Sequence, residues 1–238
     1  MPSFANRTIA GQALAASIAE QYPHWINRSD TIVLGLPRGG IPVAFAVAKG
    51  MGAPLDAYVV RKLGVPGQEE LAMGALAMDG SHHLDNSLIK WLHIAQADID
   101  ACLAREQKEL ERRATLYRGS AAAPEVTGKK VILVDDGVAT GATMRAAVHA
   151  LKKQQPAALM IAVPVAPPST LKELTSEVDH IVCLEEHEPF VGVGLWYRDF
   201  TQTSDHEVEE LLAKSKAPDR SQKGHQAPTH PREPQAMV

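Results

Sequence analysis

The sequence predicts an α/β protein built on a parallel β-sheet that is covered by helices on both faces. Its length of 238 residues suits one domain with additions, and its hydrophobic fraction of 45% is ordinary for a globular protein. From residue 130 onward, strand-like and helix-like segments alternate along the chain. The predicted strands are apolar throughout, which is typical of parallel strands buried on both faces.

The first part of the chain predicts a helix, a strand, a second helix and a second strand. Apolar residues at helical spacing predict a helix over Thr8–Tyr22. Asp30–Leu36 is a short aliphatic run that stops at a Pro-Arg-Gly-Gly turn, which predicts a strand. A helix is expected over Ile41–Gly52, with Pro42 tolerated in its first turn, and a strand over Pro54–Gly64.

The middle of the chain interrupts this pattern. Arg61–Gly80 contains several glycines and no helical stripe, and it predicts a long loop that leads into a short strand near Met73–Met78. Asn86–Gly119 is polar and charged, with Glu–Arg pairs at helical spacing, and it predicts a helical insertion. His93–Gln96 is a candidate break that would divide this insertion into two helices.

The second half of the chain predicts a β-α-β-α-β unit followed by a tail. From about Lys214 the sequence is polar, rich in proline and nearly free of large apolar residues, which predicts disorder. We therefore expect one domain over residues 1–213, with its helical insertion at about 86–119, and a disordered tail over 214–238. The expected strands are Lys130–Val134, Ala158–Pro164 and Asp179–Leu184, and the expected helices are Thr143–Gln154 and Ser169–Leu174.

Composition narrows the classes of function. The net charge of −4 and the pI of about 6.2 give no general drive toward nucleic acid or an anionic membrane. No apolar run approaches the roughly 20 residues of a membrane-spanning helix. Cys102 and Cys183 form no CxxC pair, the histidines lack the spacing of a zinc site, and the first residues lack a signal-peptide pattern. We expect a cytoplasmic protein without zinc.

An acidic pair at the end of a predicted strand is the clearest functional signal. Asp135 and Asp136 directly follow the apolar strand in "VILVDDGVATGATM". Two like charges at the tip of a buried strand cost free energy unless something compensates them. In an open α/β sheet, ligands bind beyond the carboxyl ends of the strands. The pair therefore predicts a ligand at this edge.

The loop after the acidic pair suits a phosphate. It can present several backbone N–H groups at a helix N-terminus, and its glycines allow close approach. Together with the two carboxylates, which can accept hydrogen bonds from ribose hydroxyls, it predicts a sugar-phosphate site. A buried strand followed by an Asp-Gly turn is the structural alternative. The expected loop residues are Gly137, Val138, Ala139, Thr140, Gly141, Ala142 and Thr143.

The run "VILVDDGVATGAT" resembles the phosphoribosyl pyrophosphate (PRPP) signature of type I phosphoribosyltransferases, and the resemblance extends from about Asp30 to Phe200. It implies a Rossmann-like core of five parallel strands with a smaller hood that holds a base. It also implies transfer of 5-phosphoribosyl from PRPP to a nitrogenous base with release of pyrophosphate. Magnesium would be held mainly by PRPP, near Asp135 and Asp136, and no residue is assigned as a certain ligand.

The resemblance assigns two further segments to the leaving pyrophosphate. "PRGG" stands where the family has its pyrophosphate loop, so Arg38, Gly39 and Gly40 are expected to bind the diphosphate, with a non-proline cis peptide next to Arg38. Arg61 and Lys62 begin "RKLGVPGQEEL", which stands in the place of a mobile catalytic loop. A plain surface turn and a solvated basic pair are the alternatives for these segments.

The acceptor is left open by the sequence. Ala139 occupies the position where hypoxanthine-guanine members place an aspartate, so the loop is nearer to the adenine type. Trp196 and Tyr197 lie in an aromatic segment, Glu185–Phe200, that would either stack on a base or pack over the sheet edge. The helical insertion at about 86–119 would either join the hood or form a dimer surface, so a homodimer is one possible assembly.

Two other functions compete with transfer. A non-catalytic PRPP-binding regulator would keep the same pocket, but the chain lacks a basic face for nucleic acid. A phosphoacceptor α/β domain would use the acidic pair to hold magnesium, but it leaves "TGAT" and "PRGG" unexplained. We expect the transferase.

Overall fold

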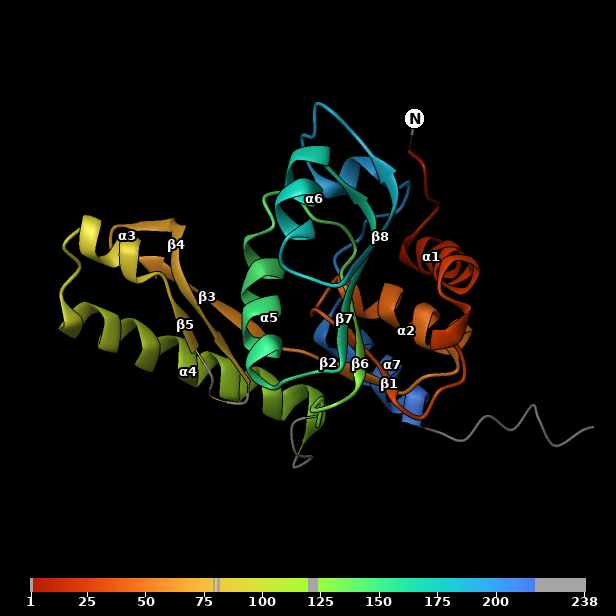
Figure 1. Cartoon of the computed structure of the whole chain (residues 1–238), viewed down its shortest axis with the longest axis horizontal. Helices are drawn as coiled ribbons and strands as arrows, with labels where there is room; N and C mark the ends of the chain where they lie inside the picture. Colours follow the sequence, from red (N-terminus) through yellow and green to blue (C-terminus); the bar gives the residue numbers. More distant parts are fainter. Residues whose placement is uncertain (1, 79, 81, 120–123, 217–238) are drawn as a thin grey trace, which may run out of the picture.

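The computed structural model describes residues 2–78, 80, 82–119 and 124–216. Its core is a five-stranded parallel sheet in the order β2-β1-β6-β7-β8 (Figure 1). The α/β class and the parallel sheet predicted from the sequence are thus confirmed. The strands are β1 (Thr31–Gly35), β2 (Leu55–Ala57), β6 (Lys130–Val134), β7 (Ala158–Ala166) and β8 (His180–Glu186).

Helices cover both faces of this sheet. In β6, Ile132 and Val134 pack in the same apolar cluster as α1, α2 and α7, whereas Val131 and Leu133 pack with α5 and α6. Successive side chains of a strand point to opposite faces, so a strand buried on both faces must be apolar at every position. The helices are α1 (Arg7–Gln21), α2 (Gly40–Met51), α5 (Ala142–Lys153), α6 (Pro168–Thr175) and α7 (Asp205–Lys216).

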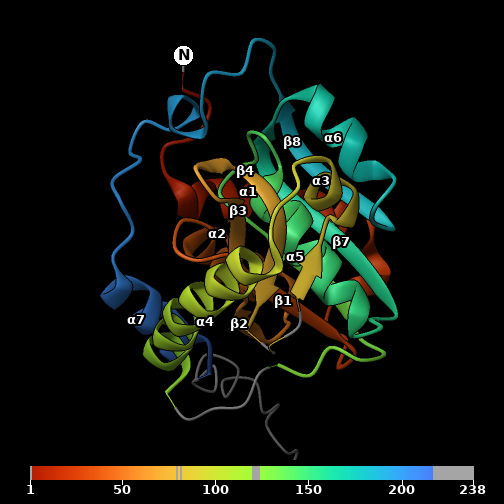
Figure 2. The same ribbon diagram turned by 90° about the vertical axis from the view of Figure 1, so that its left-hand side faces the viewer.

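The middle of the chain forms a projection that we call the arm (residues 60–118). Three antiparallel strands, β3 (Val60–Val65), β4 (Gln68–Ala77) and β5 (His82–Leu84), pair in the order β3-β4-β5. The helices α3 (Asn86–Trp91) and α4 (Gln96–Arg118) complete the arm, and α4 runs along its length (Figures 1 and 2). The predicted break at His93–Gln96 is confirmed, because it separates these helices.

Two sequence predictions for this region are wrong. The single strand expected over Pro54–Gly64 is two strands, because β2 belongs to the core and β3 to the arm. The long loop expected within Arg61–Gly80 is a hairpin that turns at Pro66 and Gly67. The glycines that suggested a loop serve the hairpin instead: Gly67 takes a positive φ of 76° at the turn, and the pairing register shifts at Gly64.

The C-terminal part of the described chain contains a helix that the sequence reasoning missed. Helix α7 buries Val208 and Leu212 against the core and ends at Lys216, so the residues from Lys214 to Lys216 belong to a helix rather than to the expected tail. The rest of that tail, residues 217–238, lies outside the described residues.

The remaining expected elements lie where the sequence predicted them. Helices α1, α2, α5 and α6 and strands β1, β6, β7 and β8 all agree with the expected bounds to within two residues. Among the residues that the structure describes, no helix has the length and apolar character needed to cross a bilayer.

Candidate active site

The acidic pair lies at the carboxyl end of β6, at the centre of the sheet edge. Asp135 and Asp136 directly follow Val134, and one carboxylate oxygen of Asp135 accepts a hydrogen bond from the backbone N–H of Asp136 at 2.8 Å. Burial and the neighbouring Asp136 carboxylate raise the pKa of Asp135 well above its ordinary value. The strand end therefore holds more negative charge than the protein around it compensates.

A single cation contacts this pair among the described residues, and sequence reasoning missed it. Arg7, at the start of α1, donates from Nε to Oδ2 of Asp136 at 2.8 Å. Burial raises the pKa of Asp136, and the hydrogen bond from Arg7 opposes that rise without reversing it. Arg7 and Asp136 are 129 positions apart, and no local pattern marks Arg7 as a site residue.

The predicted pyrophosphate loop packs directly against the acidic pair. It joins β1 to α2 and contains the expected non-proline cis peptide, between Pro37 and Arg38. A Cβ atom on Gly39 would overlap Oδ2 of the Asp136 carboxylate, and one on Gly40 would lie 2.8 Å from the carbonyl oxygen of Val134. Glycine at these positions lets the loop lie directly against the Asp136 side chain and against the backbone of the strand end.

The predicted phosphate loop lies on the other side of the acidic pair, between β6 and α5. Gly141 has a positive φ of 75° and begins α5, so the helix N-terminus faces the loop. Thr170 donates to the carbonyl of Ala139 at 2.7 Å, and Arg145 donates to the carbonyl of Thr140 at 2.8 Å. These bonds fix the loop from its carbonyl side.

The loop residues have different surroundings. The side chains of Ala139, Thr140 and Thr143 are exposed. Val138 is buried, and its N–H donates to the carbonyl of Val165 at 3.0 Å, so it packs the loop onto the sheet rather than facing a ligand. Gly137 lies under Val193, since a Cβ atom there would be 2.6 Å from Cγ1 of that residue.

Comparison with known proteins agrees with this geometry. The family model described as "Phosphoribosyl transferase domain" matches residues 5–197. The chain belongs to the phosphoribosyl transferase family. The resemblance read from the sequence is thereby confirmed at the level of the family.

Individual relatives of this family match most of the chain. "Putative phosphoribosyl transferase Rv0571c" and its counterpart MT0597, both from Mycobacterium tuberculosis, are 41% identical over 215 residues. That match covers 90% of this chain but 47% of each relative, so the chain spans about half the length of the curated relatives it matches. The crystal structure of TT1426 from Thermus thermophilus is 36% identical, covers 90% of this chain and 99% of its own, and has a TM-score of 0.80.

Arg38 of this phosphoribosyl transferase domain faces helix α7. Its Nη1 atom lies 3.8 Å from Oδ1 of Asp205, which also accepts a hydrogen bond from the hydroxyl of Tyr117 at 2.6 Å. Burial and this hydrogen bond raise the pKa of Tyr117 to about 12, so the phenol keeps its proton at neutral pH. The pyrophosphate loop is thereby linked to α7 and to the end of α4.

The two predicted aromatic residues play different parts. Trp196 stacks on the ring of His187, with ring centroids 3.4 Å apart and an angle of 4° between the planes. Tyr197 is buried, and its hydroxyl donates to the backbone carbonyl of Asp136 at 2.5 Å. Tyr197 therefore packs beneath the acidic pair, whereas Trp196 packs on His187 in the segment that follows β8.

The two predicted catalytic cations lie in the arm. Arg61, in β3, pairs with Glu106 of α4 at 2.7 Å, and Lys62 follows it in the same strand as a half-buried residue. Burial opposes ionisation of Glu106, but hydrogen bonds from Arg61 and Arg105 lower its pKa below the ordinary value. Arg61 is thus held by the arm, and its part in transfer remains a prediction.

Proposed function

We propose that this protein transfers the 5-phosphoribosyl group of PRPP to a nitrogenous base and releases pyrophosphate. One observation carries the proposal: two adjacent, largely enclosed carboxylates have a single arginine, which bonds to Asp136, and they lie between one loop that fits a phosphate and another that fits a diphosphate. A ribose that carries phosphate groups on both sides matches this order of groups. The curated relatives from Mycobacterium tuberculosis are about twice as long as this chain, so the activity of the whole protein is a proposal.

In this proposal the two loops hold the two ends of PRPP. The segment Gly137–Thr143, at the N-terminus of α5, binds the 5′-phosphate through backbone N–H groups and the Thr140 and Thr143 hydroxyls. Arg38, Gly39 and Gly40 bind the diphosphate. The reaction needs no nucleophilic side chain, since positioning and electrostatic stabilisation of the leaving group supply the acceleration.

Asp135 and Asp136 take the ribose in this arrangement. Their carboxylates accept hydrogen bonds from its vicinal hydroxyls, and their negative charge stabilises the cationic ribosyl centre as the bond to diphosphate breaks. Desolvated hydrogen bonds to a charged group contribute about 1.5–3 kcal/mol each. A ligand that donates hydroxyl protons to this pair also relieves the charge that the strand end leaves uncompensated.

The site fits a magnesium ion that arrives with PRPP. Among the described residues, no group of three or more His, Cys, Asp or Glu side chains is arranged to hold a metal. Magnesium is usually bound by substrate phosphates, water and at most one or two carboxylates, and the acidic pair stands beside the diphosphate loop. When bound, the ion neutralises charge on the leaving diphosphate.

The acceptor is proposed only as a nitrogenous base. Val193, in the segment Glu185–Phe200, lies over Gly137 of the phosphate loop, and Trp196 of the same segment is the ring on which a planar base would stack in this proposal. The site residues do not distinguish a purine from a pyrimidine. A cytoplasmic location belongs to the same proposal, supported by Cys102 and Cys183, which are both free thiols.

A second candidate function is a non-catalytic PRPP-binding regulator. Two cations that a transferase would direct at the leaving diphosphate are engaged within the protein, Arg38 near Asp205 and Arg61 with Glu106. A protein that binds PRPP without turning it over has no need to release them.

The test is to incubate the protein with PRPP, magnesium and a pool of purine and pyrimidine bases, and to measure pyrophosphate release. Release that depends on a base and is lost in the D135N/D136N variant supports the transferase, and division of the pool then identifies the acceptor. PRPP binding by calorimetry without release favours the regulator. If the protein neither binds PRPP nor releases pyrophosphate, both functions are contradicted.

A further inference from the structure

We propose that Arg7 is a positioning residue of the PRPP site, which holds the carboxylate of Asp136 in the orientation that receives a ribose hydroxyl. The inference rests on the proposed function and extends it to a residue outside the sequence motifs. Arg7 Nε contacts Oδ2 of Asp136 at 2.8 Å, and the two side chains are 11% and 13% exposed. The arginine engages Oδ2 of this carboxylate and so fixes the plane in which the carboxylate presents its oxygens.

Three contacts fix the guanidinium of Arg7. Besides Asp136, its Nη1 donates to the carbonyl of Thr201 at 2.9 Å, and its plane lies over the ring of Phe200, 3.9 Å from the centroid. A planar guanidinium can satisfy a carboxylate, a carbonyl and an aromatic face at once, whereas a lysine ammonium cannot reproduce that geometry. The position therefore selects arginine rather than positive charge alone.

The two ends of the domain form the support for Arg7. The backbone N–H groups of Ser3 and Phe4 donate to the carbonyl of Trp196 at 2.9 Å, and the N–H of Arg198 donates to Phe4 at 2.8 Å. Asn6 then caps α1 by accepting the N–H of Ile9 at 3.0 Å, so that Arg7 begins the helix.

The same support holds Asp136 from a second direction. Tyr197, which pairs with Phe4 in a short parallel bridge, donates its hydroxyl to the backbone carbonyl of Asp136. Arg7 thus holds the carboxylate of Asp136, and Tyr197 holds its backbone carbonyl. Contacts to both the side chain and the backbone of Asp136 are suited to fixing its orientation.

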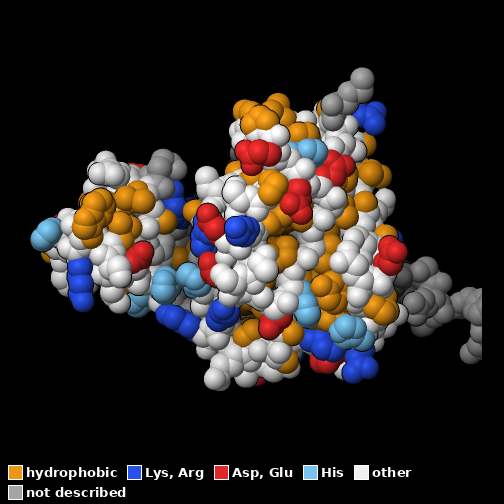
Figure 3. All heavy atoms as spheres, turned by 45° about the horizontal axis from the view of Figure 1, so that its top comes forward, with side chains coloured by type: hydrophobic (Ala, Val, Ile, Leu, Met, Phe, Trp, Pro, Cys, Tyr) orange, Lys and Arg blue, Asp and Glu red, His pale blue; other side chains and the backbone are white. Residues whose placement is uncertain are grey.

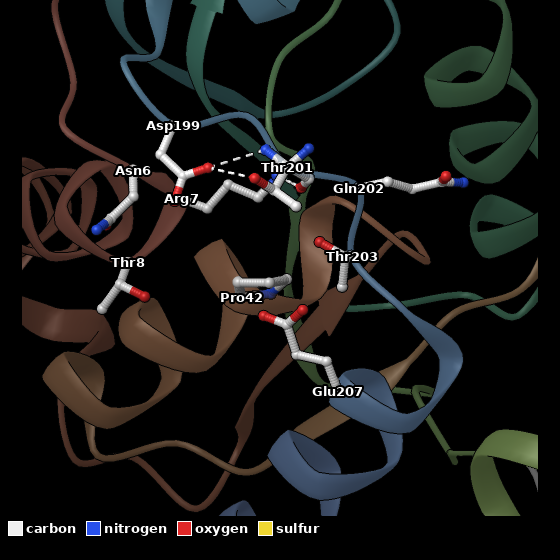
Figure 4. A pocket seen from close by; sticks show the side chains of 9 residues that line it. All are labelled: Asn6, Arg7, Thr8, Pro42, Asp199, Thr201, Gln202, Thr203 and Glu207. Atoms are coloured by element: carbon white, nitrogen blue, oxygen red, sulfur yellow. Dashed lines mark hydrogen bonds between the residues drawn. The ribbon is translucent and has the colours of Figure 1, made fainter.

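A polar pocket lies on the outer side of Arg7. Its volume is about 260 Å³, and Figure 4 shows Arg7 in its wall near Thr201 and Asp199. Because Glu207 and Asp199 also line this pocket, an anionic group is disfavoured there. This charge pattern favours an Arg7 that acts through Asp136 over one that binds diphosphate directly.

The test is a double-mutant cycle read with two probes, ribose 5-phosphate and magnesium diphosphate, by calorimetry. We expect R7Q and D136N each to weaken ribose 5-phosphate about tenfold, because each removes or misplaces a hydrogen bond to a charged group. The R7Q/D136N variant should bind it no more weakly than D136N does. R28Q, which removes the exposed pair of Arg28 and Asp30, is the matched control and should bind both probes like the wild type.

The outcomes separate the inference from the proposed function. If R7Q leaves ribose 5-phosphate affinity unchanged, or if its effect adds fully to that of D136N, Arg7 does not act through Asp136. If R7Q weakens magnesium diphosphate equally, Arg7 binds the leaving group directly and the inference is overturned. A wild type that binds neither probe overturns the proposed function and the inference with it.

A variant that fails to fold does not end the test. If thermal unfolding shows R7Q to be unfolded, R7K takes its place in both backgrounds. We expect R7K to keep the fold and magnesium diphosphate affinity but to lose several-fold in ribose 5-phosphate affinity, since it keeps the charge without the geometry. Wild-type affinity for ribose 5-phosphate in R7K would contradict a positioning role.

Discussion

The carboxylate site at the sheet edge and the carboxylate site in the arm both pair with arginine, but their surroundings differ in charge. The surface view in Figure 3 shows the arm as a separate lobe beside the core. At the sheet edge, two adjacent carboxylates, Asp135 and Asp136, have one cation in contact with them within the part of the chain that the structure describes, and that cation, Arg7, bonds to Asp136. In the arm, Arg61 and Arg105 both contact the carboxylate of Glu106, and Arg105 also lies 3.8 Å from the exposed Glu69. The number of arginines relative to enclosed carboxylates is therefore reversed between the two regions.

This reversal appears in the protonation of the acids. Burial and the second carboxylate raise the pKa of Asp135, and burial raises that of Asp136 despite Arg7. Burial acts on Glu106 as well, but two arginines outweigh it and lower its pKa. A carboxylate with surplus cations is satisfied within the protein, whereas a pair with one cation favours a ligand that donates hydrogen bonds. The difference separates a structural ion pair from a candidate binding site.

Removal of the acidic pair should have the largest effect on function. D135N/D136N is expected to lower affinity for ribose 5-phosphate by at least about 100-fold, since two hydrogen bonds to charged groups are lost. The single variant D135N, which keeps Asp136 as the partner of Arg7, should unfold at a higher temperature than the wild type, because the repulsion between the two carboxylates is removed. Calorimetry and thermal unfolding measure the two effects, and wild-type affinity in D135N/D136N would refute the site.

The close contact between the pyrophosphate loop and Asp136 can be broken at one position. In G39A, the new methyl group would overlap Oδ2 of Asp136, so either the loop or the carboxylate must move. We expect affinity for both ribose 5-phosphate and magnesium diphosphate to fall about tenfold or more. Calorimetry with each probe checks this, and an unchanged affinity for magnesium diphosphate would place the diphosphate away from this loop.

The arm pair should respond in the opposite way. E106Q is expected to destabilise the protein by about 1–3 kcal/mol, because it leaves Arg61 partly buried without its carboxylate. Its affinity for magnesium diphosphate should stay at the wild-type value if Arg61 is structural. Denaturant unfolding and calorimetry measure the two quantities.

R61Q decides whether the sequence-based assignment of Arg61 to catalysis holds. A loss of magnesium diphosphate affinity in R61Q, larger than any in E106Q, would show that Arg61 leaves Glu106 to reach the diphosphate. Wild-type affinity for magnesium diphosphate in both R61Q and E106Q would show that Arg61 has only a structural role in the arm.

The sequence predicted the core because its signals are local. Strands such as β6 and β7 are buried on both faces and therefore apolar at every position, and the acidic pair and phosphate loop follow within one short segment. The same reasoning failed for the hairpin of β3 and β4, because Gly64, Pro66 and Gly67 are typical of loops and the strands pair only through a register shift.

The rest of the site depends on contacts between distant residues. Arg7 meets Asp136 across 129 positions, and Tyr197 meets it across 61. Arg7 is a basic residue in the first turn of a helix, and nothing near it in the sequence indicates its partner. Helix α7 was missed for a similar reason, since its polar sequence buries only Val208 and Leu212 and its role depends on what they contact.

The smallest effect, but the most direct comparison of the two regions, is the pH dependence of stability. The native state holds a proton on Asp135 at pH values where the unfolded chain, with a carboxyl pKa near 3.8, has released it. It therefore binds more protons than the unfolded state in the window above 3.8, and the free energy of unfolding falls as the pH rises through that window. The free energy of unfolding of the wild type, relative to that of D135N, should therefore rise as the pH falls from about 8 to about 4.

Glu106 should give the opposite slope. Its pKa is lowered from 4.5, so its contribution to stability is present above pH 4.5 and is lost as the pH falls through the lowered value. The difference in the free energy of unfolding between wild type and E106Q should stay constant at higher pH and shrink only below pH 4.5. Denaturant unfolding of the three proteins across this range measures both slopes. Parallel slopes would mean that the two carboxylate sites are compensated alike, and the charge argument for a ligand at the sheet edge would then fail.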